Sequence, residues 1–385
     1  MSAEKWDSPV SSADRPTAAG DARRQAPLPE PFVLERGGAL LGGVIAYETW
    51  GQLNSRRDNA VLLFTGLSPS AHACASADNP SEGWWEPMIG PGKAIDTRRF
   101  YVVCVNSLGS CFGSSGPASI DPATGERWRL RFPEVSVGDI ARGGYETLRH
   151  LGLERVAAVI GPSLGGMVVL AFVVRFPGVA RSVISISGSA AASPVAIALR
   201  SVQREAILRD PAWHGGNYAP DSPPRTGMRL ARKLGTITYR SAGEWIDRFG
   251  RQRIDRDVAP VRENAFAPEF AIEGYLEAQA EKFVRAFDAN CYLYLSRAMD
   301  RFDLVDDERD LVPTLARTGL ERALVIGVES DFLFAIGEQQ KIAESLQAAG
   351  VDTRFERLDS REGHDAFLVD IDGFDPPIRQ FLASL

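Results

Sequence analysis

The sequence contains few of the features that define several large classes of protein. Its 385 residues include only four cysteines, and none of them has the C-x-x-C spacing of a zinc module or redox motif. This excludes a disulfide scaffold and gives no reason to expect a bound metal. Such sparse cysteine usage suits the reducing cytoplasm, where we expect the protein to act. No run of 18 apolar residues occurs, so the sequence predicts no transmembrane helix and no membrane partner.

Positive charge is also in deficit. The 43 lysine and arginine residues are outnumbered by 50 aspartate and glutamate residues, which gives a formal net charge of −7. This balance does not favour nucleic acid as a partner. Hydrophobic residues make up 44% and charged residues 24% of the chain, so it can bury a sizeable core as a globular protein does.

The chain divides into three regions by local pattern. Residues 1–30 are rich in Pro, Ala, Ser and Asp and have neither apolar periodicity nor the apolar core of a secretion signal. This composition predicts a disordered leader, and the absence of a signal core predicts that the protein is not secreted. Apolar runs with β-branched residues then alternate with helical patterns through residues 31–188 and again through 317–385, which predicts an α/β core with a mostly parallel sheet and helices on both faces. Between them, residues 189–316 read as helices only, so we expect an inserted helical lid.

The sharpest local motif is the G-x-S-x-G element of residues 161–165. It follows an apolar strand pattern and opens a helical one, which is the context of a nucleophile elbow. The glycines allow a sharp turn that exposes the hydroxyl of Ser163. The alternative is a plain tight turn without chemistry.

A serine hydroxyl needs a histidine base that is oriented by a carboxylate. Around an elbow of this kind, the acid and then the histidine follow the serine along the chain. Of the four histidines, only His214 and His364 come after Ser163. His364 follows the last strand pattern and is favoured, with His214 of the helical region as the alternative. Asp331 follows the strand pattern of residues 322–328 and is the expected acid, with Glu329 as runner-up.

The oxyanion of the tetrahedral intermediate needs two hydrogen-bond donors. The N–H of the residue after the nucleophile is that of Leu164. The second donor comes from the loop of residues 65–69, and its position in that loop favours the N–H of Leu67. Pro69 is excluded because it has no N–H.

Several separate blocks of sequence resemble the homoserine O-acyltransferases of the α/β-hydrolase superfamily. The resemblance runs from about Phe32 to the C-terminus, and its blocks include YETWGQLN, GWWEPMIGPGKAIDT, FYVVCVNSLGSCFGSSGPASIDPATG, FPEVSVGDIARG, VIGPSLGGM, LGTITYRS, FDANCYLYLSRAMD, SDFLF and GHDAFLVD. It implies the α/β-hydrolase fold and a ping-pong transfer of an acyl group from acyl-CoA to a hydroxy-amino-acid. Acyl-CoA is then a co-substrate, and no other cofactor is implied.

The resemblance also assigns residues to the acceptor. It implies that Arg232 binds the carboxylate of the amino acid and that Asp365 binds its ammonium group, pairings that suit a guanidinium fork and a carboxylate. It further implies a homodimer formed through the helical lid. A generic esterase, or a member of the fold that binds without catalysis, remains an alternative.

Two departures from the homoserine pattern concern substrate choice. The five residues 65–69 stand where homoserine acetyltransferases have a His-Ala-Leu-Thr-Gly type of loop, and here they are Thr65, Gly66, Leu67, Ser68 and Pro69. The rigid proline favours the shorter acceptor serine, and residues 66–69 are the expected acceptor-specificity residues. Arg200 stands where such enzymes commonly have asparagine, which favours a donor that ends in a carboxylate, succinyl-CoA. The chain therefore looks most like the serine O-succinyltransferase branch, which serves cysteine biosynthesis. The alternative is a homoserine O-acetyl- or O-succinyltransferase of methionine biosynthesis.

Overall fold

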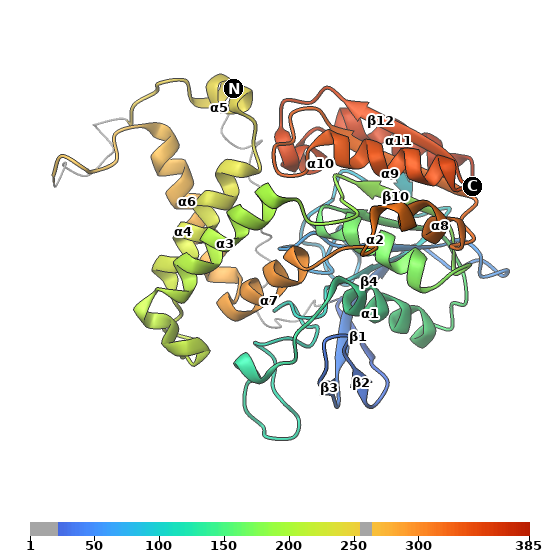
Figure 1. Ribbon diagram of the computed structural model, residues 1–385, viewed down its shortest axis with the longest axis horizontal. Helices are drawn as coiled ribbons and strands as arrows, with labels where there is room; N and C mark the ends of the chain where they lie inside the picture. The colour runs from blue at the N-terminus through green and yellow to red at the C-terminus, as the bar shows by residue number, and fades with distance from the viewer. Residues whose placement is uncertain (1–21, 255–263) are drawn as a thin grey trace.

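An eight-stranded sheet forms the centre of the computed structural model, which describes residues 22–254 and 264–385 (Figure 1). Its order is β1-β4-β8-β5-β9-β10-β11-β12, and the six strands from β8 to β12 are parallel. The strands are β1 (Arg24–Pro27), β4 (Val44–Trp50), β5 (Ala60–Phe64), β8 (Tyr101–Val105), β9 (Val156–Pro162), β10 (Ala180–Ile186), β11 (Arg322–Val328) and β12 (Asp352–Leu358). The expected mostly parallel sheet is therefore confirmed.

Short pairs of strands flank this sheet. They are β2 (Phe32–Val33) with β3 (Ala39–Leu40), and β6 (Ile89–Gly90) with β7 (Ile95–Asp96). The helices of the core are α1 (Val137–His150), α2 (Leu164–Arg175), α8 (Leu311–Ala316), α9 (Ile336–Ala348), α10 (Ala366–Val369) and α11 (Ile371–Ala383), with 3₁₀ turns η3 (Arg129–Arg131), η5 (Glu308–Asp310) and η6 (Gly363–Asp365).

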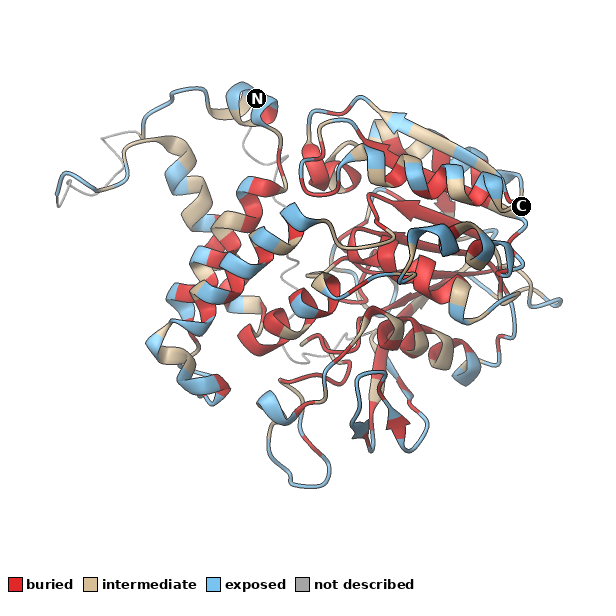
Figure 2. Ribbon diagram, viewed as in Figure 1, coloured by how far each residue is buried: buried red, intermediate tan, exposed pale blue. Residues whose placement is uncertain are grey.

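Both faces of the sheet are covered. Successive side chains of a strand point to opposite faces, and Leu62 accordingly belongs to one apolar cluster while Val61 and Leu63 belong to another. The first cluster includes buried residues of α1, α2 and α9, and the second includes those of α11. All residues of β5 and β9 are buried, and the buried colouring runs through the sheet in Figure 2. This explains why these strands read as continuous apolar runs rather than alternating ones.

The leader prediction is wrong at its C-terminal end. Residues Arg24–Pro27 form β1, which pairs antiparallel with β4, and Ala26 is completely buried. Backbone hydrogen bonds hold this edge strand, so its sequence, RQAP, carries no apolar run that would have revealed it. Residues 1–21 lie outside the described residues, and disorder there stays a prediction.

The inserted region forms a helical lobe beside the sheet, at the left of Figure 1. Its elements are α3 (Pro194–Leu208), η4 (Pro211–Gly216), α4 (Arg225–Thr238), α5 (Ala242–Phe249), α6 (Ala271–Ala286) and α7 (Ala289–Asp300). The two ends of the insertion meet, because the N–H of Ala192 donates to the carbonyl of Phe302 at 2.9 Å and the N–H of Leu304 donates to the carbonyl of Ala190 at 2.8 Å. Helix α8 packs against α9 of the core. The lobe therefore closes near Phe302, earlier than the expected boundary at residue 316.

No helix within the described part of the chain is long and apolar enough to cross a membrane.

Candidate active site

Ser163 occupies the turn between β9 and α2 with φ 57° and ψ −119°, a backbone conformation that L-residues rarely adopt. The flanking glycines are required by close contacts. A Cβ atom at Gly161 would lie 2.2 Å from the carbonyl oxygen of Gly165, and one at Gly165 would lie 2.7 Å from that of Phe64. The N–H of Ser163 is held by the carbonyl of Ile186 at 2.9 Å. The motif thus forms the sharp elbow that the sequence predicts.

The structure brings the three expected triad side chains together. The Oγ of Ser163 lies 2.7 Å from Nε2 of His364, and Nδ1 of His364 lies 2.7 Å from Oδ2 of Asp331. The other carboxylate oxygen of Asp331 accepts from the N–H groups of Leu333 and Phe334, both at 2.9 Å. All three side chains are buried. This geometry can move a proton from the serine to an imidazole whose orientation the aspartate fixes.

Neither runner-up joins this arrangement. Glu329 pairs with Nη2 of Arg357 at 2.6 Å, and its side chain is 41% exposed. His214 is exposed in η4 of the helical lobe. The placement therefore favours Asp331 and His364.

His364 lies among aromatic rings and negative charge. Phe334 stacks on the imidazole with ring centroids 4.9 Å apart. Burial lowers the pKa of His364, but the charge and hydrogen bond of Asp331, with a further contribution from the charge of Asp365, outweigh burial and raise that pKa above its usual 6.5. The imidazole is thus a stronger base than an ordinary histidine.

A single cavity joins Ser163 and His364 to the other expected site residues. The loop after β5 contributes Gly66, Leu67, Ser68 and Pro69 to the lining of this cavity. The helical lobe contributes Arg200 and Arg232, and the C-terminal region contributes Asp365. Leu164, whose N–H is the other expected oxyanion donor, is buried and is the first residue of α2. The N–H groups of a first helical turn have no partner within the helix, so this N–H can serve an anion beside Ser163.

The charged groups of the cavity differ in how far they are already paired. Arg232 lies over the rings of Phe283 and Tyr239, at 4.6 and 5.7 Å from their centroids, and its Nε has no hydrogen-bond partner among residues 22–254 and 264–385. Asp365, by contrast, pairs with Nε of Arg240 at 3.2 Å. In the same described ranges, no group of three or more His, Cys, Asp or Glu side chains could hold a metal ion.

Several cavity residues were not predicted from the sequence, among them Gln203, Tyr239 and Tyr292. Gln203 follows Arg200 by three positions on α3, so helical periodicity could have placed it on the same face. Tyr239 and Tyr292 also line the cavity. Both lie in the blocks that carry the family resemblance, but no motif marks them as substrate contacts.

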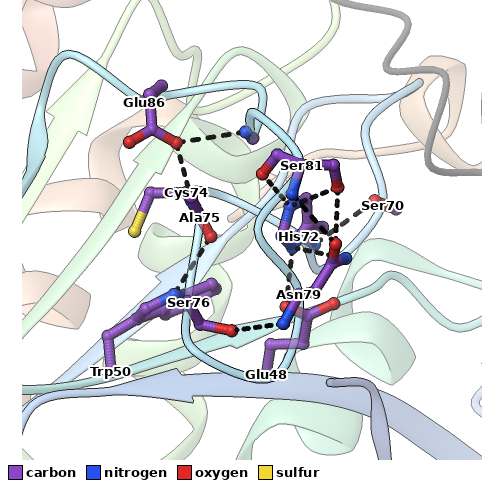
Figure 3. Close-up of polar contacts among 11 residues, drawn as sticks. Glu48, Trp50, Ser70, His72, Cys74, Ala75, Ser76, Asn79, Ser81 and Glu86 are labelled. Carbon is purple, nitrogen blue, oxygen red and sulfur yellow. Dashed lines mark hydrogen bonds and ion pairs between the residues drawn. The ribbon is translucent and has the colours of Figure 1, made fainter. Parts of the chain in front are cut away.

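Figure 3 shows a cluster of polar contacts around His72. Nδ1 of His72 lies 2.8 Å from Oε2 of Glu48 on β4, and Nε2 lies 2.9 Å from the carbonyl oxygen of Ser81. The carbonyl of His72 accepts from the N–H of Trp84 at 3.2 Å, and Trp84 lines the cavity. His72 thus fastens the segment that carries Trp84 to the central sheet. Glu48 precedes His72 by 24 residues, and no sequence motif indicates that the two side chains interact.

Comparisons with known proteins identify the family of this chain. Residues 59–371 match the profile of the alpha/beta hydrolase fold family, and the chain belongs to that family. Within it, the chain belongs with a group of curated proteins named serine O-succinyltransferase. The protein of that name from Stenotrophomonas maltophilia (strain K279a) is 56% identical over 93% of this chain and 96% of its own length. That from Xanthomonas campestris pv. campestris (strain B100) is 55% identical over 93% of this chain and 96% of its own.

Solved structures of related proteins have the same fold as this chain. The homoserine O-acetyltransferase from Bacillus anthracis superposes with a TM-score of 0.84 at 26% identity, covering 94% of this chain and 97% of that one. Esterase E22 superposes with a TM-score of 0.81 at 27% identity, covering 94% and 99%. The resemblance and the fold expected from the sequence are confirmed.

The raised pKa of His364 predicts the pH dependence of activity. Because the base must be neutral, kcat/KM for the acyl donor should rise with pH and level off only above an apparent pKa higher than 6.5. In Asp331→Asn the charge that most offsets the burial of His364 is lost, and only the smaller contribution of Asp365 remains. The rise should therefore move to lower pH, and the rate should fall by about 10³–10⁴-fold. Steady-state pH profiles measure both effects. Glu329→Gln is the matched control and should keep the wild-type profile. An unshifted profile in Asp331→Asn would contradict the assignment.

The pair of His72 and Glu48 predicts a pH-dependent stability. Burial lowers the pKa of His72, but the hydrogen bond and charge of Glu48, together with the carbonyl of Ser81 and the charge of Glu86, raise it overall above 6.5. The stability that the protonated His72 gains from Glu48 is therefore fully present below pH 6.5. It is lost as the pH rises through the pKa of His72 in the folded protein. Glu48→Gln should reduce the free energy of unfolding by about 2–4 kcal/mol at pH 6, and by less at pH 9. Urea denaturation of both proteins at each pH tests this, and a difference that does not change with pH would refute it.

Proposed function

We propose that the protein is an acyl-CoA-dependent O-acyltransferase that transfers the succinyl group of succinyl-CoA to the hydroxyl of L-serine. The observation that carries this proposal is that Ser163 and His364 share one cavity with two buried arginines, Arg200 and Arg232. Such a cavity suits a donor and an acceptor that each bring a carboxylate to the reacting serine. The names of the 55–56% identical relatives support the same reaction.

In the first half-reaction, Oγ of Ser163 attacks the thioester carbonyl carbon while Nε2 of His364 takes the hydroxyl proton. Asp331 stabilises the imidazolium, and the N–H groups of Leu164 and Leu67 receive the oxyanion. The carbon–sulfur bond then breaks, CoA leaves as the thiol with the proton from His364, and the succinyl group remains as an ester on Ser163.

In the second half-reaction, the hydroxyl of the amino acid attacks this ester. His364 takes its proton and returns one to Ser163 as the acyl–serine bond breaks, which releases O-succinyl-L-serine. Water competes with the acceptor at this stage. The helical lobe covers the cavity with residues of α3, α4 and α7 and so limits the access of water.

The acceptor is held by its two charged ends. Arg232 binds the carboxylate and Asp365 binds the ammonium group, while residues 66–69 form the wall beside the reacting hydroxyl. Pro69 has a fixed φ, and its carbonyl accepts from the side-chain amide of Asn106 at 3.2 Å. This loop is therefore rigid, which suits the short side chain of serine better than a longer one.

The donor is selected by Arg200. Its side chain is 6% exposed, and its two terminal guanidinium nitrogens have no hydrogen-bond partner in the described ranges. Unsatisfied buried donors are costly, and the terminal carboxylate of a succinyl group would satisfy both of them at once. A homoserine O-acetyltransferase is the second candidate, which the close superposition on the Bacillus anthracis protein favours.

We further propose that the protein acts in the cytoplasm, in the biosynthesis of cysteine, as a homodimer formed through the helical lobe. Apolar side chains of α3 and α4 that a partner could cover are exposed on this lobe: Val195, Val202, Leu230 and Ile237.

The proposal predicts the outcome of a four-way assay. Initial rates are measured with serine and homoserine, each with succinyl-CoA and acetyl-CoA. We expect succinyl-CoA with serine to give the highest kcat/KM. A clear preference for acetyl-CoA with homoserine would overturn the proposed substrates, and rapid ester hydrolysis without any acceptor would instead indicate an esterase.

The same assay tests Arg200. A bidentate charge-assisted pair contributes roughly 1.5–3 kcal/mol, so Arg200→Asn should lower the ratio of kcat/KM for succinyl-CoA to that for acetyl-CoA by about 10- to 150-fold. Arg209→Asn is the matched control, because Arg209 caps the same helix but its side chain is 78% exposed. An unchanged ratio in Arg200→Asn would place the donor carboxylate elsewhere.

A further inference from the structure

Another buried arginine, Arg204, lies next to Arg200 of the proposed donor site. Arg204 lies one helical turn after Arg200 on α3, and both arginines meet Asp300, the last residue of α7. Nε of Arg200 lies 2.5 Å from one carboxylate oxygen of Asp300, and Nη2 of Arg204 lies 2.5 Å from the other. Within the described ranges, Arg200 is among the residues that line the cavity and Arg204 is not.

The side chains of Arg200, Arg204 and Asp300 together carry one net positive charge. The side chains of Arg200, Arg204 and Asp300 are only 6%, 9% and 3% exposed, and a buried charge without a counter-ion is unfavourable. The hydroxyl of Ser296 faces Nη1 of Arg204 at 3.4 Å but carries no charge. The groups that remain free to receive an anion are the terminal nitrogens of Arg200. Glu338 is near enough for its charge to interact with Arg200, but the ion pair of Arg200 is with Asp300. Arg200 lines the cavity and can therefore bind one further anion there.

Arg204 determines whether that excess charge exists. If Arg204 were neutral, Asp300 would balance Arg200, and the pair would present no net charge to the donor. With Arg204 present, the second oxygen of Asp300 forms an ion pair with that arginine, and Arg200 retains its attraction for an anion.

We propose that Arg204 is a specificity-determining residue for the acyl donor. It acts through Asp300 and Arg200, without touching the substrate, to keep the cluster positive and so favour an acyl group that ends in a carboxylate over a neutral one. This inference rests on the proposed use of succinyl-CoA and of Arg200 as its partner.

A purely structural role for Arg204 makes a different prediction. The arginine also ties α3 to α7, and loss of that tie alone would lower activity with every donor to the same extent. The ratio of kcat/KM for succinyl-CoA to that for acetyl-CoA separates the two roles, because partial unfolding cancels when both donors are measured on one preparation.

The test compares wild type with Arg204→Gln and Arg204→Met, with serine as the acceptor. The two replacements differ in polarity, so the ratio can be measured in whichever variant folds. We expect it to fall on the order of tenfold, mainly through a higher KM for succinyl-CoA. Arg204→Lys keeps the charge and should retain most of the preference, and the exposed Arg209→Gln should leave the ratio unchanged. If neither Arg204→Gln nor Arg204→Met lowers the ratio, the inference is refuted.

A charge-balanced double variant gives an independent check. Arg204→Gln combined with Asp300→Asn removes one positive and one negative charge, so Arg200 again supplies one net positive charge. The preference for succinyl-CoA should return towards the wild-type value, and its failure to return would show that net charge is not the cause. If Arg200→Asn leaves the ratio unchanged, the proposed donor site itself is wrong. If Arg200→Asn lowers the ratio and neither Arg204→Gln nor Arg204→Met does, only the role of Arg204 is wrong.

Discussion

The close approach of the chain to itself at Gly161 and Gly165 is the constraint on which the site depends. With no side chain at either position, the backbone can turn within one residue from β9 into α2. This turn holds Ser163 in its strained conformation, where its hydroxyl meets a histidine 201 residues further along the chain. Strand β9 lies between β5 and β10, and the segments after β11 and β12 bring Asp331 and His364 to the turn that follows it. The parallel topology thus gathers Ser163, His364, Asp331 and the loop of residues 66–69 at the carboxyl ends of the strands.

Hydrolases and transferases can both use a serine, histidine and aspartate arranged in this way. The residues that line the cavity determine which substrates reach them. The helical lobe leaves and rejoins the core at one place, Ala190 to Leu304, where the two passages are hydrogen-bonded. From this base its helices bring buried arginines over Ser163. Buried cations with unsatisfied hydrogen bonds are tolerated where a ligand completes them, and they bias the cavity towards substrates with carboxylates.

Sequence reasoning was most successful where chemistry fixes spacing or order. The elbow at Ser163 has a local signature, and the order of acid and histidine left Asp331 and His364 as first choices. The cavity residues Arg200 and Arg232 were found only through resemblance to a family. The pairs of Arg204 with Asp300 and of Glu48 with His72 could not be predicted, because each joins distant residues on elements that are brought together only by tertiary packing. Strand β1 was missed for a different reason, since backbone pairing at a sheet edge leaves little trace in the side chains.

The central claim is that Ser163 carries the acyl group between donor and acceptor. Intact-protein mass spectrometry after rapid mixing with succinyl-CoA, in the absence of any amino acid, tests it most directly. The account predicts a mass increase of one succinyl group, located on Ser163 by peptide mapping, absent in Ser163→Ala, and discharged when serine is added. Product formation at the normal rate without this adduct, or an adduct that persists in Ser163→Ala, would contradict it.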